Sequence, residues 1–193
     1  MNRLERKLMT SHLSNKKLRN SIVTASQAWS AVYERQKLWK EKTGRAEPFQ
    51  GNEMTEYGNA HEHIALAAFE DEMKGICRAG NKLIVHPNRP LGASPDGYLG
   101  VIPVEIKCPW TQKIYPEIPE RYWFQMQVQM FCVGVEACWF YIWTPNETSK
   151  EMVFYDEAFM DWFIPKAEEF VQYVRDDVEP PRYKRKPKYN KEK

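Results

Sequence analysis

The chain has 193 residues, of which 42% are hydrophobic, 13% aromatic and 28% charged. This length suits one compact domain, and the apolar share excludes an intrinsically disordered chain. No segment approaches the roughly 20 apolar residues that a membrane-spanning helix needs, and the charged N-terminus lacks the apolar region of a secretory signal. We therefore expect a soluble cytoplasmic protein without a membrane partner.

The cysteines give little support for a disulfide framework or a metal centre. Four are present, at irregular spacing and without a C-x-x-C pair, so we predict reduced thiols in apolar surroundings. The same spacing does not fit an iron–sulfur cluster held by four cysteines. Catalytic zinc is also disfavoured, because His61 is followed four residues later by Ala65 and no H-E-x-x-H motif is formed.

The net charge is only +2, but basic residues collect at both ends of the chain. Such clusters can neutralise phosphates, although a solvated tail is the simpler interpretation of the second cluster. We predict a single domain over residues 1–179 and a basic C-terminal tail over 180–193. The clusters are Arg3, Arg6, Lys7, Lys16, Lys17 and Arg19, then Arg182, Lys184, Arg185, Lys186, Lys188, Lys191 and Lys193.

Helical periodicity dominates the first part of the chain. It predicts a helix over 24–40 and, after a loop, a second helix over 53–74. Glu62 lies four residues before Leu66 and therefore at the edge of the apolar face of the second helix. A carboxylate at this position is unusual for a solvated glutamate. The apolar positions of this face are Leu66, Phe69 and Met73.

Strand signals follow from residue 82 onwards, and two further helices interrupt or close them. The resulting order of elements predicts an α/β or α+β domain. Pro165 is expected to kink or break the last helix. The predicted strands are 82–86, 92–96, 101–108, 137–143 and 150–155, a turn follows Pro95, and the helices are 119–133 and 157–176.

The strand over 101–108 alternates strictly, and its polar positions carry the chemistry. Glu105 and Lys107 share one face, while the other face is apolar and is expected to pack on the core. The Glu–Lys face is therefore predicted to look into a polar cavity or solvent. Asp96 precedes the strand, and a hairpin-like turn over 95–100 can fold it back beside Glu105.

Three carboxylates near one lysine favour a hard divalent cation, Mg²⁺ or Mn²⁺, with oxygen ligands. Asp96 and Glu105 are the expected ligands, with the Ile106 carbonyl as a third and Glu62 as a further acidic member. Such a site can hydrolyse a phosphodiester, with Lys107 orienting or deprotonating water or stabilising negative charge. The simpler alternative is an exposed Glu–Lys pair beside an aspartate that serves only the turn. An isolated E-x-K triplet would favour this alternative, but SPDG, the E-x-K strand and Glu62 together favour the metal site.

Two motifs carry a resemblance to a known superfamily. The SPDG segment at 94–97, followed by VEIKCP at 104–109, resembles the PD-(D/E)XK nuclease signature and, more narrowly, the phage lambda exonuclease or YqaJ-like family. Further segments in the same order are also similar to that family, so the resemblance covers about 19–143. These segments are RNSIVTAS at 19–26, GNAHE at 58–62 and QVQ at 127–129.

The resemblance implies a restriction-endonuclease-like core, with a central mixed β-sheet flanked by helices. It also implies a Mg²⁺-dependent 5′→3′ exonuclease that digests linear double-stranded DNA from its ends and leaves 3′ tails for single-strand annealing recombination. A homotrimer, an annealing-protein partner and a phage or prophage origin in a bacterial host are implied as well.

The same resemblance assigns individual residues. The implied catalytic set is Glu62, Asp96, Glu105, Lys107 and Gln127, and the implied 5′-phosphate pocket is Arg19, Ser26 and Ser94. Two assignments stay open at this point. Gln127 is preferred to Gln129 by its place in the motif, although either can point inward. The Ser26 hydroxyl serves equally well at the start of a helix.

Two alternative functions remain at this level. One is an endonuclease of the same superfamily that cuts internally, and the other is a non-catalytic DNA-binding subunit that has kept the fold. Trp110, directly after the E-x-K strand, is a candidate wedge at the duplex end, although tryptophans more often belong to a core.

Overall fold

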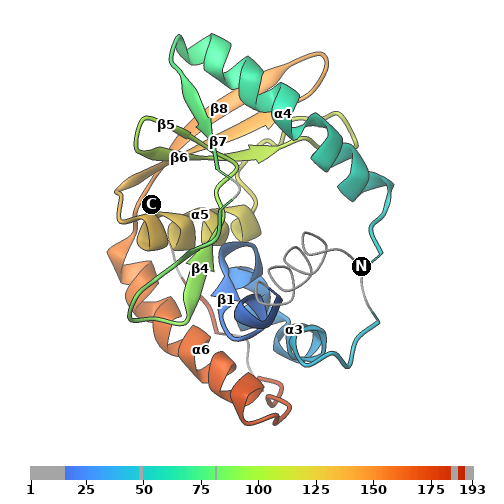
Figure 1. The fold of residues 1–193 in the computed structure, drawn as a ribbon, viewed down its shortest axis with the longest axis vertical. Helices are drawn as coiled ribbons and strands as arrows, with labels where there is room; N and C mark the ends of the chain where they lie inside the picture. Colours follow the sequence, from blue (N-terminus) through green and yellow to red (C-terminus); the bar gives the residue numbers. More distant parts are fainter. Residues whose placement is uncertain (1–15, 48–49, 81, 184–186, 190–193) are drawn as a thin grey trace, which may run out of the picture.

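A five-stranded sheet forms the centre of the protein in the computed structural model, which describes residues 16–47, 50–80, 82–183 and 187–189. Its strand order is β2-β5-β6-β7-β8. Only β6 and β7 run parallel, so the sheet is mixed, as predicted (Figure 1). The strands are β2 (Cys77–Ala79), β5 (Gly97–Leu99), β6 (Ile102–Lys107), β7 (Ala137–Trp143) and β8 (Thr148–Phe154).

A helix covers each face of this sheet. On one face, α4 (Glu53–Met73) packs Ala65 and Phe69 against Val104, Ile106 and Tyr141 of the sheet. On the other face lies α5 (Glu120–Val133), the crossover between the parallel strands β6 and β7 (Figure 1). Parallel neighbours need such a crossover because a tight hairpin cannot join them. Strand β6 is therefore enclosed between two helices.

A small second sheet joins the N-terminal segment to the middle of the chain. It has the order β1-β4-β3, with β1 (Val23–Thr24), β4 (Leu91–Ala93) and β3 (Ile84–Val85). Strands β1 and β4 are parallel, with Thr24 opposite Gly92. The larger hydrophobic core lies between this region, α5 and α6 (Glu157–Arg175), which runs along the lower left of Figure 1.

The single helix predicted over 24–40 is wrong. The segment consists of β1, a 3-10 turn η1 (Ala25–Gln27), α2 (Ala28–Tyr33) and α3 (Arg35–Lys42). Glu34 separates the two helices with φ −126° and ψ 37°. The break lets Arg35 bury its side chain against Glu169 and the ring of Tyr173, a tertiary contact with α6 that helical periodicity does not report.

The strands before residue 102 also differ from the prediction. The expected turn over 95–100 contains the strand β5, which pairs with β6, and the chain reverses at Gly100, whose φ is +64°. Strand β2 was not predicted. Both strands are only three residues long, too short for a period of two to stand out.

The remaining elements agree closely with the sequence. Helix α4, helix α5 and strand β7 begin and end within one residue of their predicted bounds. The break expected at Pro165 is wrong, because α6 continues through this residue as one helix. All four cysteines are free, as predicted. In the described part of the chain, no helix is long and apolar enough to cross a membrane.

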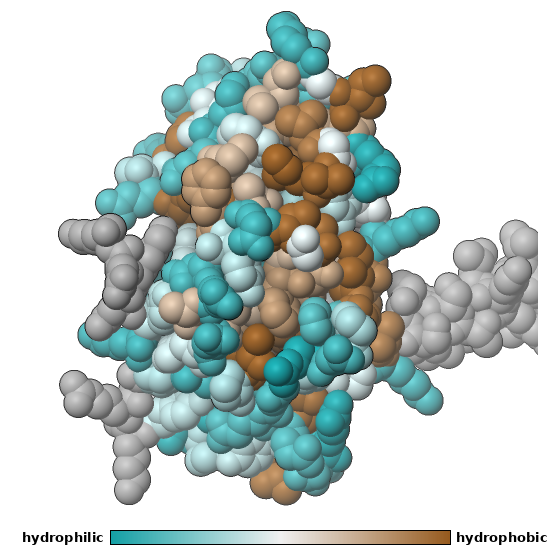
Figure 2. All heavy atoms as spheres, turned by 90° about the vertical axis from the view of Figure 1, so that its left-hand side faces the viewer, coloured by the Kyte–Doolittle hydropathy of each residue, from teal (hydrophilic) through white to brown (hydrophobic). Residues whose placement is uncertain are grey.

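The two basic ends are described only in part. Arg3, Arg6 and Lys7 lie outside the described residues, as do 184–186 and 190–193 of the predicted tail. Tyr189 does not behave as a solvated tail residue, because its hydroxyl donates to both carboxylate oxygens of Asp156, at 2.8 and 2.7 Å. The exposed surface is mixed, and one face gathers apolar side chains between hydrophilic regions (Figure 2).

Candidate active site

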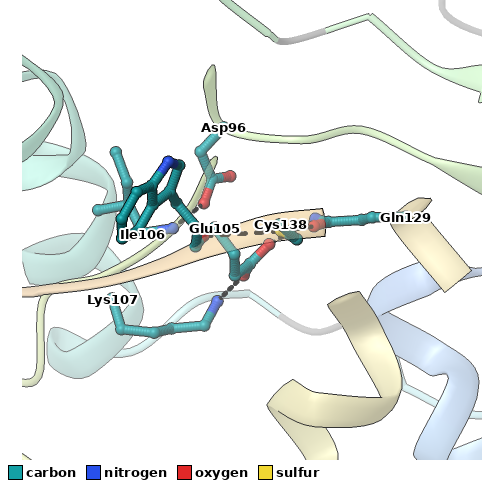
Figure 3. Close-up of polar contacts among 7 residues, drawn as sticks. Asp96, Glu105, Ile106, Lys107, Gln129 and Cys138 are labelled. Carbon is teal, nitrogen blue, oxygen red and sulfur yellow. Dashed lines mark hydrogen bonds and ion pairs between the residues drawn. The ribbon is translucent and has the colours of Figure 1, made fainter. Parts of the chain in front are cut away.

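Glu105 is the centre of the polar cluster on β6 (Figure 3). Its side chain is fully buried, and its two carboxylate oxygens have different partners. Lys107 Nζ forms an ion pair with Oε1, while Gln129 Nε2 of α5 donates to Oε2 at 2.5 Å. Cys138 Sγ in turn donates to Gln129 Oε1 at 3.5 Å, which leaves the amide fixed in one orientation.

The expectation that the Glu–Lys face looks into a cavity or solvent holds for only one of the two residues. Lys107 keeps 22% of its side chain exposed, whereas Glu105 lies in the protein interior beneath α5. The reason is the crossover helix, which covers this face as closely as α4 covers the apolar one. Alternation in a strand identifies two faces but does not show which of them a later helix will cover.

The preference for Gln127 over Gln129 is corrected by the structure. Gln127 does not bond to Glu105. Its amide donates to the Phe154 carbonyl at 2.9 Å and accepts from the backbone N–H of Asp156 at 2.8 Å. It therefore joins the end of β8 to the start of α6. Both glutamines are fully buried, so neither burial nor motif position distinguishes them. The partner of Glu105 could be found only from the register of α5 over the sheet.

Asp96 is tied to β6 from the neighbouring chain segment. Its N–H donates to the Val104 carbonyl at 3.2 Å, and its Oδ2 accepts from the Ile106 N–H at 2.7 Å. These bonds extend the β5–β6 pairing by one position and place the carboxylate beside Glu105. Gly80 contributes from the other side, because its N–H donates to the Asp96 carbonyl at 3.1 Å. The predicted proximity of Asp96 to Glu105 is thus met by the β5–β6 hairpin, which reverses at Gly100.

The charges of the cluster act strongly on one another. Burial, followed by the nearby Glu105 carboxylate, raises the pKa of Asp96 well above its ordinary value. Burial and Glu105 also raise the pKa of Glu62 on α4. Burial alone would lower the pKa of Lys107, but the carboxylates of Glu105 and Asp96 outweigh it and hold the pKa above its ordinary value. Lys107 is therefore a cation, and the three carboxylates share one electrostatic environment.

A pocket of about 510 Å³ opens beside this cluster. Its lining includes the charged residues Glu62, Asp96 and Lys107 and the aromatic residues Trp110 and Tyr122. The Lys107 ammonium lies 4.7 Å from the centre of the Tyr122 ring, which favours the cation. The pocket therefore places a positive charge, carboxylates and aromatic surface within reach of one bound molecule.

The donor chemistry of the cluster fits a hard divalent cation. Its groups are carboxylates, whose oxygens such a cation prefers, and burial followed by the charge of Glu105 raises the pKa of both Asp96 and Glu62. Among the described residues, no three His, Cys, Asp or Glu side chains already stand in a metal-binding arrangement. Both Glu105 oxygens are engaged by Lys107 and Gln129, so a cation would have to draw the carboxylates together.

The residues expected to bind a 5′-phosphate lie on segments that flank the small second sheet: Arg19 in the helical turn 16–20, Ser26 on η1 and Ser94 directly after β4. Arg19 Nη2 donates to Ser94 Oγ at 3.2 Å, so the structure brings these two together from distant parts of the chain. Ser26, on η1, shares a hydrogen bond of 3.3 Å with Thr24. The parallel pairing of β1 with β4 holds η1 in the same region. Ser94 lies two residues before Asp96, so one short segment contributes both to the acidic cluster and to the residues expected to bind a 5′-phosphate.

Comparison with known proteins identifies the family. The model of the YqaJ-like viral recombinase domain matches residues 15–136, more than half of the chain. The chain belongs to this family. No curated protein sequence matches it. The family assignment agrees with the segments from RNSIVTAS to QVQ, all of which lie inside the matched range.

Solved structures support the same conclusion. An alkaline exonuclease from Laribacter hongkongensis, LHK-Exo, is 26% identical, with a TM-score of 0.67 over 83% of this chain and 91% of that one. Its complex with dAMP gives 27% identity and a TM-score of 0.71 over 84% and 92%. A phage-related exonuclease from Haemophilus somnus shares the fold at 12% identity, with a TM-score of 0.65 over 81% and 96%. This YqaJ-like protein is therefore a nuclease with a PD-(D/E)XK-type fold.

Proposed function

We propose that this YqaJ-like protein is a Mg²⁺-dependent 5′→3′ exonuclease that acts on the ends of linear double-stranded DNA and leaves 3′ single-stranded tails. Mn²⁺ is the expected substitute for Mg²⁺. The observation that carries the proposal is the arrangement of Asp96, Glu105 and Lys107 beside a pocket, with the Arg19–Ser94 pair only two residues from Asp96 along the chain.

The proposed ligands of the cation are Asp96, Glu105, the Ile106 carbonyl and Glu62. A Mg²⁺ ion held there would supply an activated water and would neutralise charge on the phosphate under attack. Lys107, held as a cation by its carboxylate neighbours, stabilises the negative charge that develops there and orients the water, and is not the base. Gln129 holds Glu105 in position for this role, in place of the earlier candidate Gln127.

The second group of residues supports the proposed direction of digestion. Arg19, Ser26 and Ser94 offer a guanidinium and two hydroxyls, which suit the oxygens of a terminal phosphate. Two residues of extended chain span about 7 Å, so Ser94 and Asp96 are separated by a distance on the order of that between neighbouring phosphates of one strand. A terminal phosphate bound at Ser94 then brings the next phosphodiester to Asp96.

The wider context is proposed from the family. We propose a homotrimer, because a ring keeps the enzyme on the strand that it digests, and a single-strand annealing protein as the partner that receives the 3′ tail. A phage or prophage in the cytoplasm of a bacterial host is the proposed setting. Light scattering of the purified protein tests the trimer directly, since a monomer has a mass of 22.9 kDa.

The direction is tested with linear duplexes labelled at the 5′ or the 3′ end of one strand. We expect early release of the 5′ label as a mononucleotide in Mg²⁺, while the 3′ label stays in long fragments. Early release of the 3′ label would reverse the proposed direction. Internal fragments carrying neither end would instead favour an endonuclease, and binding without cleavage would favour the non-catalytic subunit.

A further inference from the structure

Lys42 is a buried lysine at the C-terminal end of α3, outside the acidic cluster. Only 5% of the residue is exposed. Its ammonium donates two short hydrogen bonds, one to the Arg19 carbonyl at 2.7 Å and one to the Ile22 carbonyl at 2.6 Å. Both acceptors belong to a single stretch of four residues, so one side chain holds both ends of that stretch.

The placement of this cation is energetically unfavourable on its own. Burial lowers the pKa of Lys42 to about 7; Glu41 opposes this effect and the positive charge of Arg19 adds to it. Removing an ammonium from water is costly unless hydrogen bonds replace the lost hydration. The two carbonyls provide them, whereas an apolar side chain could fill the same volume without the cost. The position therefore calls for a reason beyond packing.

The segment that Lys42 holds connects two fixed parts of the structure. Residues 16–20 are helical, and the Ser21 N–H still bonds to the carbonyls of that helical turn. Ile22 leads directly into β1, which pairs with β4. Arg19 lies in that helical turn, and its guanidinium reaches Ser94 just after β4. The direction in which Arg19 leaves the backbone is thus set where Lys42 binds its carbonyl.

We propose that Lys42 is a positioning residue that fixes the backbone of Arg19 so that its guanidinium meets Ser94 in the terminal-phosphate pocket. The inference rests on the proposed function, because it gives Lys42 its role through that pocket. Lys42 does not line the pocket beside Asp96, so it acts through Arg19 and not on the DNA.

The test is the preference of the enzyme for phosphorylated ends. Initial rates are measured on otherwise identical linear duplexes with a 5′-phosphate or a 5′-hydroxyl, for wild type and for Lys42→Met. Lys37→Met is the matched control, because Lys37 lies on the same helix with 70% of its side chain exposed. We expect the ratio of the rate on 5′-phosphate ends to the rate on 5′-hydroxyl ends to fall about 10-fold or more in Lys42→Met, chiefly because phosphorylated ends are digested more slowly. In Lys37→Met the ratio should stay near wild type. Thermal melting shows whether each variant is folded.

A double-mutant cycle with Arg19→Ala separates positioning from general damage. Two residues that act as a unit are non-additive, so Lys42→Met should lower the ratio no further once Arg19 is gone. If Lys42→Met does not fold, Lys42→Gln, which keeps a polar donor, takes its place in the cycle. A ratio that is unchanged in the folded Lys42 variant but lost in Arg19→Ala overturns this inference alone. A wild-type ratio near one overturns the terminal-phosphate pocket and this inference with it.

Discussion

The Gln129 amide and the Glu105 carboxylate meet at 2.5 Å, and both side chains are fully buried. This contact joins the crossover helix to the strand that carries the proposed metal ligand. The second Glu105 oxygen binds Lys107, so a single carboxylate links a neutral donor in the interior to a cation at the pocket. The orientation of Glu105 is therefore set by Gln129 on the interior side and by Lys107 on the pocket side.

Replacing Gln129 with methionine should reduce nuclease activity much more than stability alone explains. The variant leaves one Glu105 oxygen without its donor, and loss of such an orienting partner typically costs 10–100-fold in metal affinity or activity. Activity is measured as a function of Mg²⁺ concentration, and we expect a higher requirement for the metal.

Gln127→Met is the matched control, since it removes an equally buried amide two residues away. It breaks the bonds to Phe154 and Asp156, which should destabilise the protein by about 1–3 kcal/mol but leave the Mg²⁺ requirement near wild type. An equal change in Mg²⁺ requirement in both variants would contradict the role assigned to Gln129.

Because of these carboxyl groups, we expect a rise in pH to change the stability of the protein in opposite directions with and without metal. The pKa of Asp96 and that of Glu62 are raised in the folded protein, so these groups hold protons there that the unfolded chain has released. These two groups contribute fully to the free energy of unfolding below about pH 4, which is the ordinary pKa range of carboxyl groups. The contribution is lost as the pH rises toward their raised pKa values. In EDTA, wild type should lose more stability over this range than Asp96→Asn.

Mg²⁺ should reverse this trend, because it binds the ionised carboxylates in competition with protons. We therefore expect the increase in melting temperature caused by Mg²⁺ to grow with pH in wild type and to be small in Asp96→Asn. Thermal melts at several pH values, in EDTA and in Mg²⁺, give both quantities. A metal-induced increase that shrinks with rising pH would contradict the proposed ligands.

Gly80 supports Asp96 through a close approach of two chain segments. A Cβ at this position would lie 1.8 Å from the Pro95 carbonyl oxygen, which is backbone and cannot turn aside. Gly80→Ala should displace Pro95 and Asp96, lower the melting temperature and reduce activity at least 10-fold. Gly58→Ala provides the contrast in stability, because its Cβ meets nothing within 4 Å on α4. That helix should gain about 0.5–1 kcal/mol.

Trp110 remains a candidate wedge at the duplex end. The residue is 47% exposed and lines the pocket, and its ring packs edge-on against Tyr57, with 5.3 Å between the ring centres. If it separates the terminal base pair, Trp110→Ala should slow digestion of blunt duplex ends several-fold more than digestion of ends that are already frayed. Equal rates on blunt ends for wild type and variant would remove this role.

The sequence predicted the parts of the fold that depend on local pattern. The helix with Glu62, the crossover helix and the alternation around Glu105 each follow from a period that spans many residues. Strands β2 and β5 do not, because each is only three residues long. The break at Glu34 does not either, because it accompanies contacts of Arg35 with α6, far along the chain.

The candidate site also contains residues that local motifs predict and residues that they do not. Asp96, Glu105 and Lys107 stand in recognisable motifs, whereas the choice between Gln127 and Gln129 depends on how α5 lies over β6. Lys42 carries no local signal at all. Its surroundings arise only when α3 packs against the segment that leads into β1.

The most direct test of the proposed active site is digestion of linear and closed-circular duplex DNA in Mg²⁺ or EDTA, by wild type and by Lys107→Ala. We expect wild type to degrade only the linear DNA and only in Mg²⁺, while folded Lys107→Ala loses activity by about 100-fold or more. Cleavage of the circle would contradict digestion from an end. Full activity of Lys107→Ala, or of wild type in EDTA, would contradict the active site itself.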